Sequence, residues 1–188
     1  MSLPNISKLK PGFLGKIKQF CCYSLRELTD SNYAPKIDFD VYMEKAGMHL
    51  QRGDVWDLRQ KQELIKSIIY DRSIMPLSIL QYHPNSEMNS EKIWKIIDGK
   101  QRLKAALGFV KDEFPIFVFG KEYLFSELPD DWKSQIMRFR FNGNFIYTYP
   151  DDNLSDKQMV QWFHYVNFSG TPQEDVHMAT LFESIKYT

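Results

Sequence analysis

The sequence contains few of the residues that build covalent or metal-bound scaffolds. Its only two cysteines are the neighbours Cys21 and Cys22, and it has four histidines among 188 residues. Adjacent cysteines rarely pair with each other, so no disulfide framework is expected. The histidines are scattered without metal-ligand spacing, and the sequence therefore predicts no metal site built from protein side chains.

Two further absences concern partners and location. Lysine plus arginine and aspartate plus glutamate both number 24, so no net charge draws the whole chain to nucleic acid or to a membrane surface. No long apolar run and no signal peptide is visible, which predicts a protein without a membrane partner. We therefore expect a reducing, cytoplasmic location.

The composition that is present predicts a folded core, because 43% of the residues are hydrophobic and 15% are aromatic. Periodicity predicts the clearest helix over 57–70, and strands and helices alternate irregularly around it. The fold class expected is α+β with a small mixed sheet. We expect an N-terminal arm over 1–22, a core domain over 23–120, and a mostly helical C-terminal extension over 121–188 that packs on the core.

The helices and strands expected around these boundaries are short. Their predicted ranges are strands over 39–42, 48–51, 77–82, 93–97, 114–119 and 144–149, and helices over 101–110, 131–139, 156–166 and 173–185.

The segment from Ile96 to Ala106 carries the strongest functional signal. An apolar strand ends at Asp98-Gly99, and a helix-favouring run follows at once. Gly99 permits a tight turn, Asp98 is placed to cap the helix, and Gln101 is placed to complete a capping box. The backbone N–H groups at such a helix start, flanked by Lys100 and Arg102, suit a phosphate. An ordinary capped turn explains the same local pattern equally well.

A second segment is Gln51-Arg52, which precedes a glycine turn and the helix expected over 57–70. Arg52 is either solvated, paired with Asp54, or bound to a phosphate. The last alternative gains weight only if Arg52 converges on Arg102.

A third segment is Asn167 with the following Gly170-Thr171-Pro172. Threonine followed by proline is an ordinary helix entry. That explanation does not give a role to Asn167, whose amide either reaches a ligand or closes the turn.

Taken in order, these segments resemble the ParB/sulfiredoxin-like superfamily. ParB-type domains carry a Gly-Glu-Arg-Arg box where this chain has Gly99-Lys100-Gln101-Arg102. A branch catalogued as domain of unknown function 262 is more similar still. It has an Asp-Gly-Gln-Gln-Arg signature, an upstream Gln-Arg before Val-Trp, and a downstream Asn-x-x-Gly-Thr-Pro. This chain has all three, the first of them with Lys100 in place of the first glutamine, and the resemblance extends over about residues 23–181. Relatives occur in GmrSD-type modification-dependent restriction enzymes and in phage-defence proteins.

The resemblance implies a fold, a ligand and a set of site residues. It implies a ParB/sulfiredoxin-like core that binds a nucleoside triphosphate with Mg²⁺ and hydrolyses it. Asp98 and Gln101 would take the catalytic roles, and the phosphate-binding residues would be Gln51, Arg52, Gly99, Lys100, Arg102 and Asn167. Lys100 departs from the usual signature, which has glutamine at this position, and it adds a positive charge.

The resemblance also implies partners. A domain of a restriction or phage-defence system would work with DNA or with a separate nuclease domain or subunit. No nuclease motif is visible within these 188 residues, so this chain is expected to be a part of a larger protein or a stand-alone module. Two alternatives stay open, a non-catalytic DNA-binding or interaction module and a ParB-like nuclease. The nuclease ranks last because the sequence lacks a carboxylate cluster for two metal ions.

Overall fold

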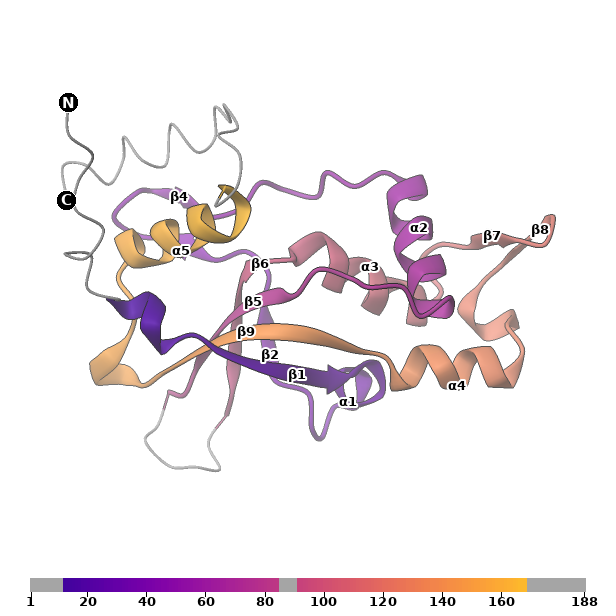
Figure 1. The fold of residues 1–188 in the computed structure, drawn as a ribbon, viewed down its shortest axis with the longest axis horizontal. Helices are drawn as coiled ribbons and strands as arrows, with labels where there is room; N and C mark the ends of the chain where they lie inside the picture. The colour runs from indigo at the N-terminus through magenta and orange to yellow at the C-terminus, as the bar shows by residue number, and fades with distance from the viewer. Residues whose placement is uncertain (1–11, 85–90, 169–188) are drawn as a thin grey trace.

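The fold is built on a five-stranded mixed sheet in the order β1-β9-β5-β6-β2 (Figure 1). The computed structural model describes residues 12–84 and 91–168. The strands are β1 (Lys18–Ser24), β9 (Arg140–Thr148), β5 (Leu77–Tyr82), β6 (Ile93–Asp98) and β2 (Lys36–Asp38). The pairs β1–β9 and β5–β6 are antiparallel, whereas β9–β5 and β6–β2 are parallel. The predicted α+β class with a mixed sheet is confirmed.

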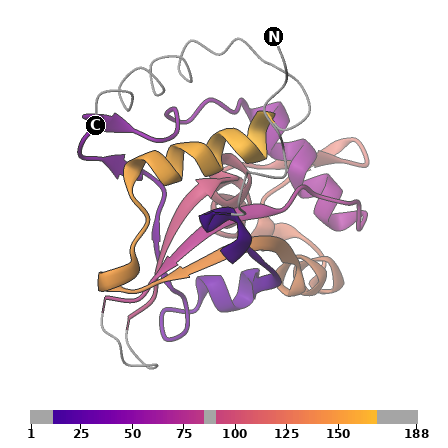
Figure 2. The same cartoon turned by 60° about the vertical axis from the view of Figure 1, so that its left-hand side comes forward.

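Helices cover both faces of this sheet (Figures 1 and 2). The larger core lies on the side of four helices, α1 (Leu25–Thr29), α2 (Leu58–Ile69), α3 (Lys100–Val110) and α4 (Asp130–Arg138). Helix α5 (Asp156–Phe168) packs on the opposite side. Successive strand residues point to opposite faces, so Ile96 joins the first core and Ile97 the second. Strand β6 is therefore fixed from both sides, and with it the turn that follows.

Helix α2 confirms the clearest prediction from periodicity. Its N-cap Asp57 accepts a hydrogen bond from the backbone N–H of Gln60, and the Gln60 side chain accepts one from the backbone N–H of Asp57. This capping box satisfies two backbone donors that the helix leaves unpaired. The apolar residues of α2 are buried except for Leu58 in the first turn, which is 47% exposed.

Strands β1 and β9 differ from what the sequence predicted. Residues 18–22, expected within an arm, form most of β1 and pair with β9. The first four residues of β1 are all exposed, so the sequence lacks the alternation of apolar and polar residues that predicts a strand. Strand β9 begins at Arg140 rather than 144 and lies between β1 and β5. One sheet therefore crosses both expected boundaries, at residues 22 and 120.

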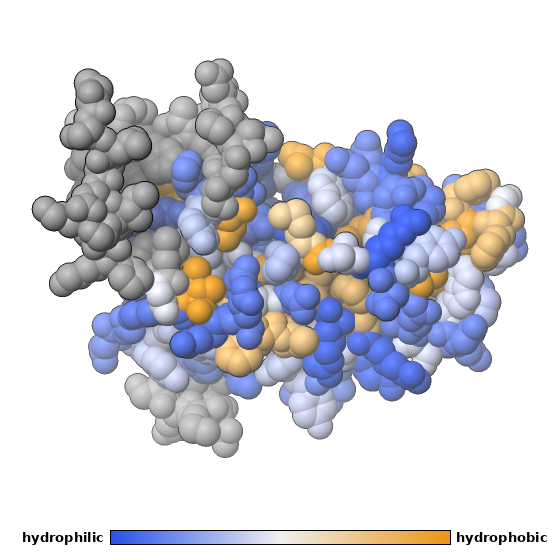
Figure 3. Space-filling view, in the orientation of Figure 1, coloured by the Kyte–Doolittle hydropathy of each residue, from blue (hydrophilic) through white to orange (hydrophobic). Residues whose placement is uncertain are grey.

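Two small hairpins complete the described chain with three 3₁₀ turns, Phe13–Lys16, Phe125–Glu127 and Pro150–Asp152. Strands β3 (Tyr42–Met43), β4 (Met48–His49) and β7 (Ile116–Val118) are shorter than predicted, and β8 (Lys121–Tyr123) was not predicted. The β7–β8 hairpin exposes Phe117 and Phe119, at an end of the molecule with apolar surface in Figure 3.

Within the described ranges, no helix combines the length and the apolar character that crossing a membrane requires. The final helix expected over 173–185 and the Gly170-Thr171-Pro172 segment lie outside the described residues.

Candidate functional site

The turn from β6 into α3 is shaped by Gly99. This residue is the N-cap of α3 and has a φ of +93°, in the left-handed region that favours glycine. A Cβ atom here would also collide with the buried side chain of Leu77. Both the backbone conformation and the packing therefore require glycine.

The predicted capping by Asp98 and Gln101 is wrong, because Gly99 occupies the N-cap and no side chain caps the helix. Asp98 is still part of β6, and its Oδ2 accepts a hydrogen bond of 2.6 Å from Arg102 Nη2. The other terminal nitrogen of Arg102 donates to the carbonyl oxygens of Met75 and Pro76. The side chains of Arg102 and Asp98 are only 13% and 19% exposed. In this conformation Arg102 joins the start of α3 to the start of β5.

Lys100, the residue that departs from the signature, is buried as well. Its side chain is 3% exposed, and Nζ lies 2.5 Å from Oδ1 of Asp40. This hydrogen bond holds the pKa of the Asp40 carboxyl below its usual value. The cation of Lys100 thus has a carboxylate partner in the loop between β2 and β3.

Gln101 joins the first turn of α3 to the loop of residues 51–56. Its Nε2 donates to the Gly53 carbonyl at 3.1 Å, and its Oε1 accepts from the N–H groups of Val55 and Trp56 at 3.4 Å. Gln51 fastens the same loop to β6, since its Nε2 donates to the Ile96 carbonyl at 2.6 Å. Two segments far apart in the sequence, Gln51–Trp56 and Asp98–Arg102, therefore lie side by side. Arg52 is exposed within this loop.

A third ion pair links this loop to α3. Lys104 Nζ lies 2.6 Å from Asp54 Oδ2, and the side chains are 37% and 54% exposed. Because Lys104 donates to it, the Asp54 carboxyl has a pKa below its usual value. Asp54 is therefore the partner of Lys104.

Asn167 lies in α5, one residue beyond the predicted helix end. Its Nδ2 donates to the Phe163 carbonyl at 2.8 Å, one turn earlier in the same helix. In this conformation the amide closes a helical turn.

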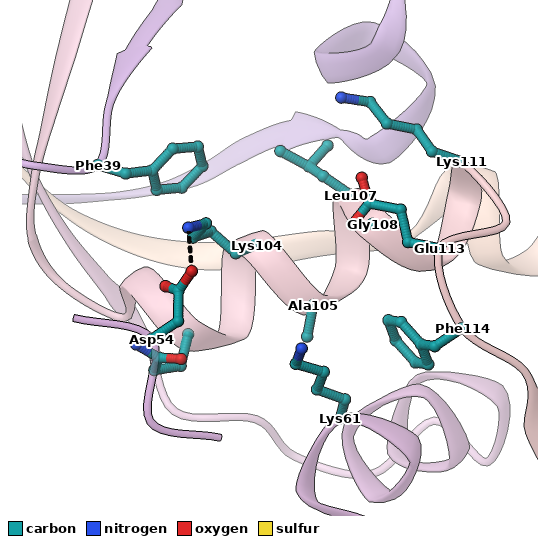
Figure 4. A pocket seen from close by; sticks show the side chains of 11 residues that line it. Phe39, Asp54, Lys61, Lys104, Ala105, Leu107, Gly108, Lys111, Glu113 and Phe114 are labelled. Carbon is teal, nitrogen blue, oxygen red and sulfur yellow. Dashed lines mark hydrogen bonds and ion pairs between the residues drawn. The ribbon is translucent and has the colours of Figure 1, made fainter. Parts of the chain in front are cut away.

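A cavity of about 260 Å³ lies along α3, beside the turn (Figure 4). Gln101 is the predicted site residue that lines it. The other residues around it are Phe39, Asp54, Lys61, Lys104, Ala105, Leu107, Gly108, Lys111, Glu113 and Phe114. Sequence reasoning missed its lysines. The signal was the helical spacing of Gln101, Lys104 and Lys111, which places their side chains along one side of the segment.

The carboxylates nearest the turn do not form a metal site. Asp98, Asp40 and Asp54 each pair with a different cation. In the described part of the chain, no group of three or more histidine, cysteine, aspartate or glutamate side chains is arranged to hold a metal ion. These residues therefore do not fit a Mg²⁺ ion bound by the protein alone.

Comparison with known proteins adds a family. No curated protein and no solved structure gives a significant match. The sequence model of the GmrSD restriction endonuclease N-terminal domain matches residues 49–182. This range contains the loop of residues 51–56, the β6–α3 turn, the lysines of the cavity and Asn167. Since the match covers well over half of the chain, the chain belongs to the family of GmrSD restriction endonuclease N-terminal domains.

Proposed function

We propose that this domain binds a nucleoside triphosphate at the start of α3, as a ParB/sulfiredoxin-like component of a restriction or phage-defence system. The observation that carries the proposal is the convergence of two sequence segments. The loop containing Gln51 and Arg52 is hydrogen-bonded to Gln101 in the first turn of α3, next to Gly99. Family membership supports the restriction or defence context.

The geometry at the turn supports an anionic ligand. With glycine at the N-cap, no side chain caps the first turn of α3. The first N–H groups of a helix carry partial positive charge and attract phosphates. Asp98 and Arg102 contribute by holding the turn in shape, because their side chains are mostly buried and paired with each other.

The binding test is a calorimetric titration of the purified chain with each of the four ribonucleoside triphosphates in the presence of Mg²⁺. We expect one or more to bind. Gln101→Glu should weaken that binding at least tenfold, because it places a negative charge beside the phosphates. Gln101→Ala serves as the control that removes the loop contacts without adding charge. Absence of binding to all four nucleotides contradicts the proposal, and equal affinity of wild type and Gln101→Glu contradicts the location.

Hydrolysis is the second part of the proposal. The resemblance gives Asp98 and Gln101 catalytic roles, yet here Asp98 binds Arg102 and Gln101 binds the loop. Catalysis by these residues requires both to change partners when the nucleotide binds. Because the nearby carboxylates do not form a metal site, Mg²⁺ would arrive on the phosphates. Phosphate release that is lost in Asp98→Asn supports hydrolysis, whereas binding without any release contradicts it.

A further inference from the structure

We propose that the phosphate chain of the nucleotide lies in the cavity along α3, where Lys61 and Lys104 neutralise it, and that Asp54 holds Lys104 until the nucleotide displaces it. This placement rests on the proposed function. It differs from the family resemblance, which assigns the phosphates to the cations of the turn itself.

The first step is that the cations of the turn are already engaged. Arg102 donates to one carboxylate and two backbone carbonyls, and its side chain is 13% exposed. Lys100 is 3% exposed and bound to Asp40. A phosphate that recruited either cation would leave a carboxylate without its partner, and for the mostly buried Asp98 that is costly.

The second step is that accessible cations line the neighbouring cavity. Lys61 comes from α2, Lys104 from α3, and Lys111 is the residue that follows the last turn of α3. Figure 4 shows the Lys61 side chain reaching from α2 toward Ala105 of α3, and the Lys104 side chain pointing toward Asp54 and Phe39. Glu113 also lines the cavity, packed against Gly108. Once Asp54 is displaced, three lysines face one carboxylate, which favours an anion.

The third step concerns the two aromatic rings of the cavity. The ammonium group of Lys61 lies 5.9 Å from the ring centre of Phe114, and that of Lys104 lies 5.8 Å from the ring centre of Phe39. Cation–π contacts of this kind hold a lysine side chain in place and keep water from one side of it. Both ammonium groups are thereby oriented before a ligand arrives.

The size of the cavity decides which part of the nucleotide enters. Its volume of about 260 Å³ is below the roughly 300–1,000 Å³ of pockets that enclose a whole drug-sized ligand. The cavity therefore accommodates part of a nucleoside triphosphate. Because three lysines line the cavity, that part is the phosphate chain, with the base outside.

The fourth step is the competition between Asp54 and the phosphate. The Asp54 carboxylate occupies Lys104 at 2.6 Å, yet both side chains are more than one third exposed. Exposed ion pairs contribute little net stability, so the exchange of a carboxylate for a phosphate is inexpensive. The loop of residues 51–56 thus acts as a competitor for the site.

The test measures binding of the nucleotide identified above, and of inorganic tripolyphosphate, to the full chain and its variants. Lys61→Ala and Lys104→Ala should each weaken binding of both ligands about tenfold, since each removes a charge-assisted contact. Asp54→Asn should strengthen binding severalfold, because Lys104 is then free. Lys66→Ala is the matched control, since Lys66 lies on α2 outside the cavity and pairs with Glu63. Thermal unfolding of each variant verifies that it is folded.

The outcomes separate this placement from the proposed function. If the wild type binds no nucleotide, the proposed function fails and the placement with it. If the wild type binds but Lys61→Ala and Lys104→Ala bind equally well, the placement is overturned and the function stands. Tripolyphosphate that fails to compete with the nucleotide also overturns it. The placement is also overturned if Lys61→Ala and Lys104→Ala weaken the binding of an oligonucleotide only, because the cavity would then contact nucleic acid.

Discussion

The β6–α3 turn and the loop of residues 51–56 touch each other, but they are held in different ways. At the turn, the Asp98–Arg102 pair is mostly buried and is reinforced by two backbone carbonyls of the residues before β5. At the loop, the Asp54–Lys104 pair is exposed, and two hydrogen bonds to Gln101 are 3.4 Å long. The same motif therefore combines a mostly buried contact that fixes the geometry of the turn with an exposed contact that costs little to break.

The largest expected effect is at Arg102. Arg102→Ala leaves the Asp98 carboxylate and two carbonyls without their donor, and loss of one partner of a buried pair costs about 3–5 kcal/mol. Urea unfolding measures this. Arg138→Ala, at an exposed site on α4, is the control and should change the free energy of unfolding by no more than about 0.5 kcal/mol. If Arg102→Ala is as stable as the wild type, the turn is not held as described.

The next effect is at Gly99. Gly99→Ala must adopt a φ near +93° and push its Cβ against Leu77, so we expect a loss of about 2–3 kcal/mol. The same unfolding experiment measures it. Gly53→Ala, in the loop and with no neighbour within 4 Å of the added Cβ, is the matched control. Similar losses at the two glycines would erase the contrast between the turn and the loop.

A smaller effect is expected at Gln101. Gln101→Ala removes the hydrogen bonds to Gly53, Val55 and Trp56 but none of those made by Arg102. Global stability should change by about 1 kcal/mol or less. Native-state hydrogen exchange should show faster exchange at Val55 and Trp56 and unchanged exchange in α3. Faster exchange throughout α3 would mean that the loop is as firmly integrated as the turn.

The smallest effect is the pH dependence of the loop. The pKa of Asp54 lies below its usual value of 3.8 because Lys104 donates to it. The stabilisation is therefore present above the pKa of the unfolded chain and is lost as the pH falls through the lowered folded value. Both side chains are exposed, so we expect only a few tenths of a kcal/mol.

Tryptophan fluorescence measures this release, because Trp56 belongs to the loop and is partly buried. The fluorescence of Trp56 is obtained by subtracting the signal of Trp56→Phe from that of the wild type, and it should change below pH 4. When both proteins also carry Asp54→Asn, the same difference should stay constant. If the fluorescence of Trp56 changes at the same pH in Asp54→Asn, the change is due to the titration of another group.

The elements that sequence predicted well are those with a complete local signal. Helix α2 has a capping box and a repeating apolar face, and β5 has the predicted bounds, 77–82. Strand β1 lacked such a signal, because most of its residues are exposed at the edge of the sheet. Its pairing with β9 is a long-range property that no local pattern contains.

For the candidate site too, local sequence signals were informative and contacts between distant segments were not predicted. Sequence singled out Gln51 and Gln101, and the structure joins their segments through hydrogen bonds. It did not predict that Arg102 would be engaged by Asp98 and two carbonyls, since those carbonyls belong to Met75 and Pro76. Lys61 was missed because its place in the same cavity as Lys104 depends on how α2 packs on α3.

The position of β9 has a consequence for synthesis of the protein. Cys21 in β1 and its β9 partner Asn142 are 121 residues apart, and β9 separates β1 from β5. A chain emerging from the ribosome thus carries β1 without its partner and β5 with one edge open until β9 follows. Such edges pair readily with other nascent chains. Translational pausing before Arg140 should therefore favour aggregation, and a chaperone that shields β5 should relieve it.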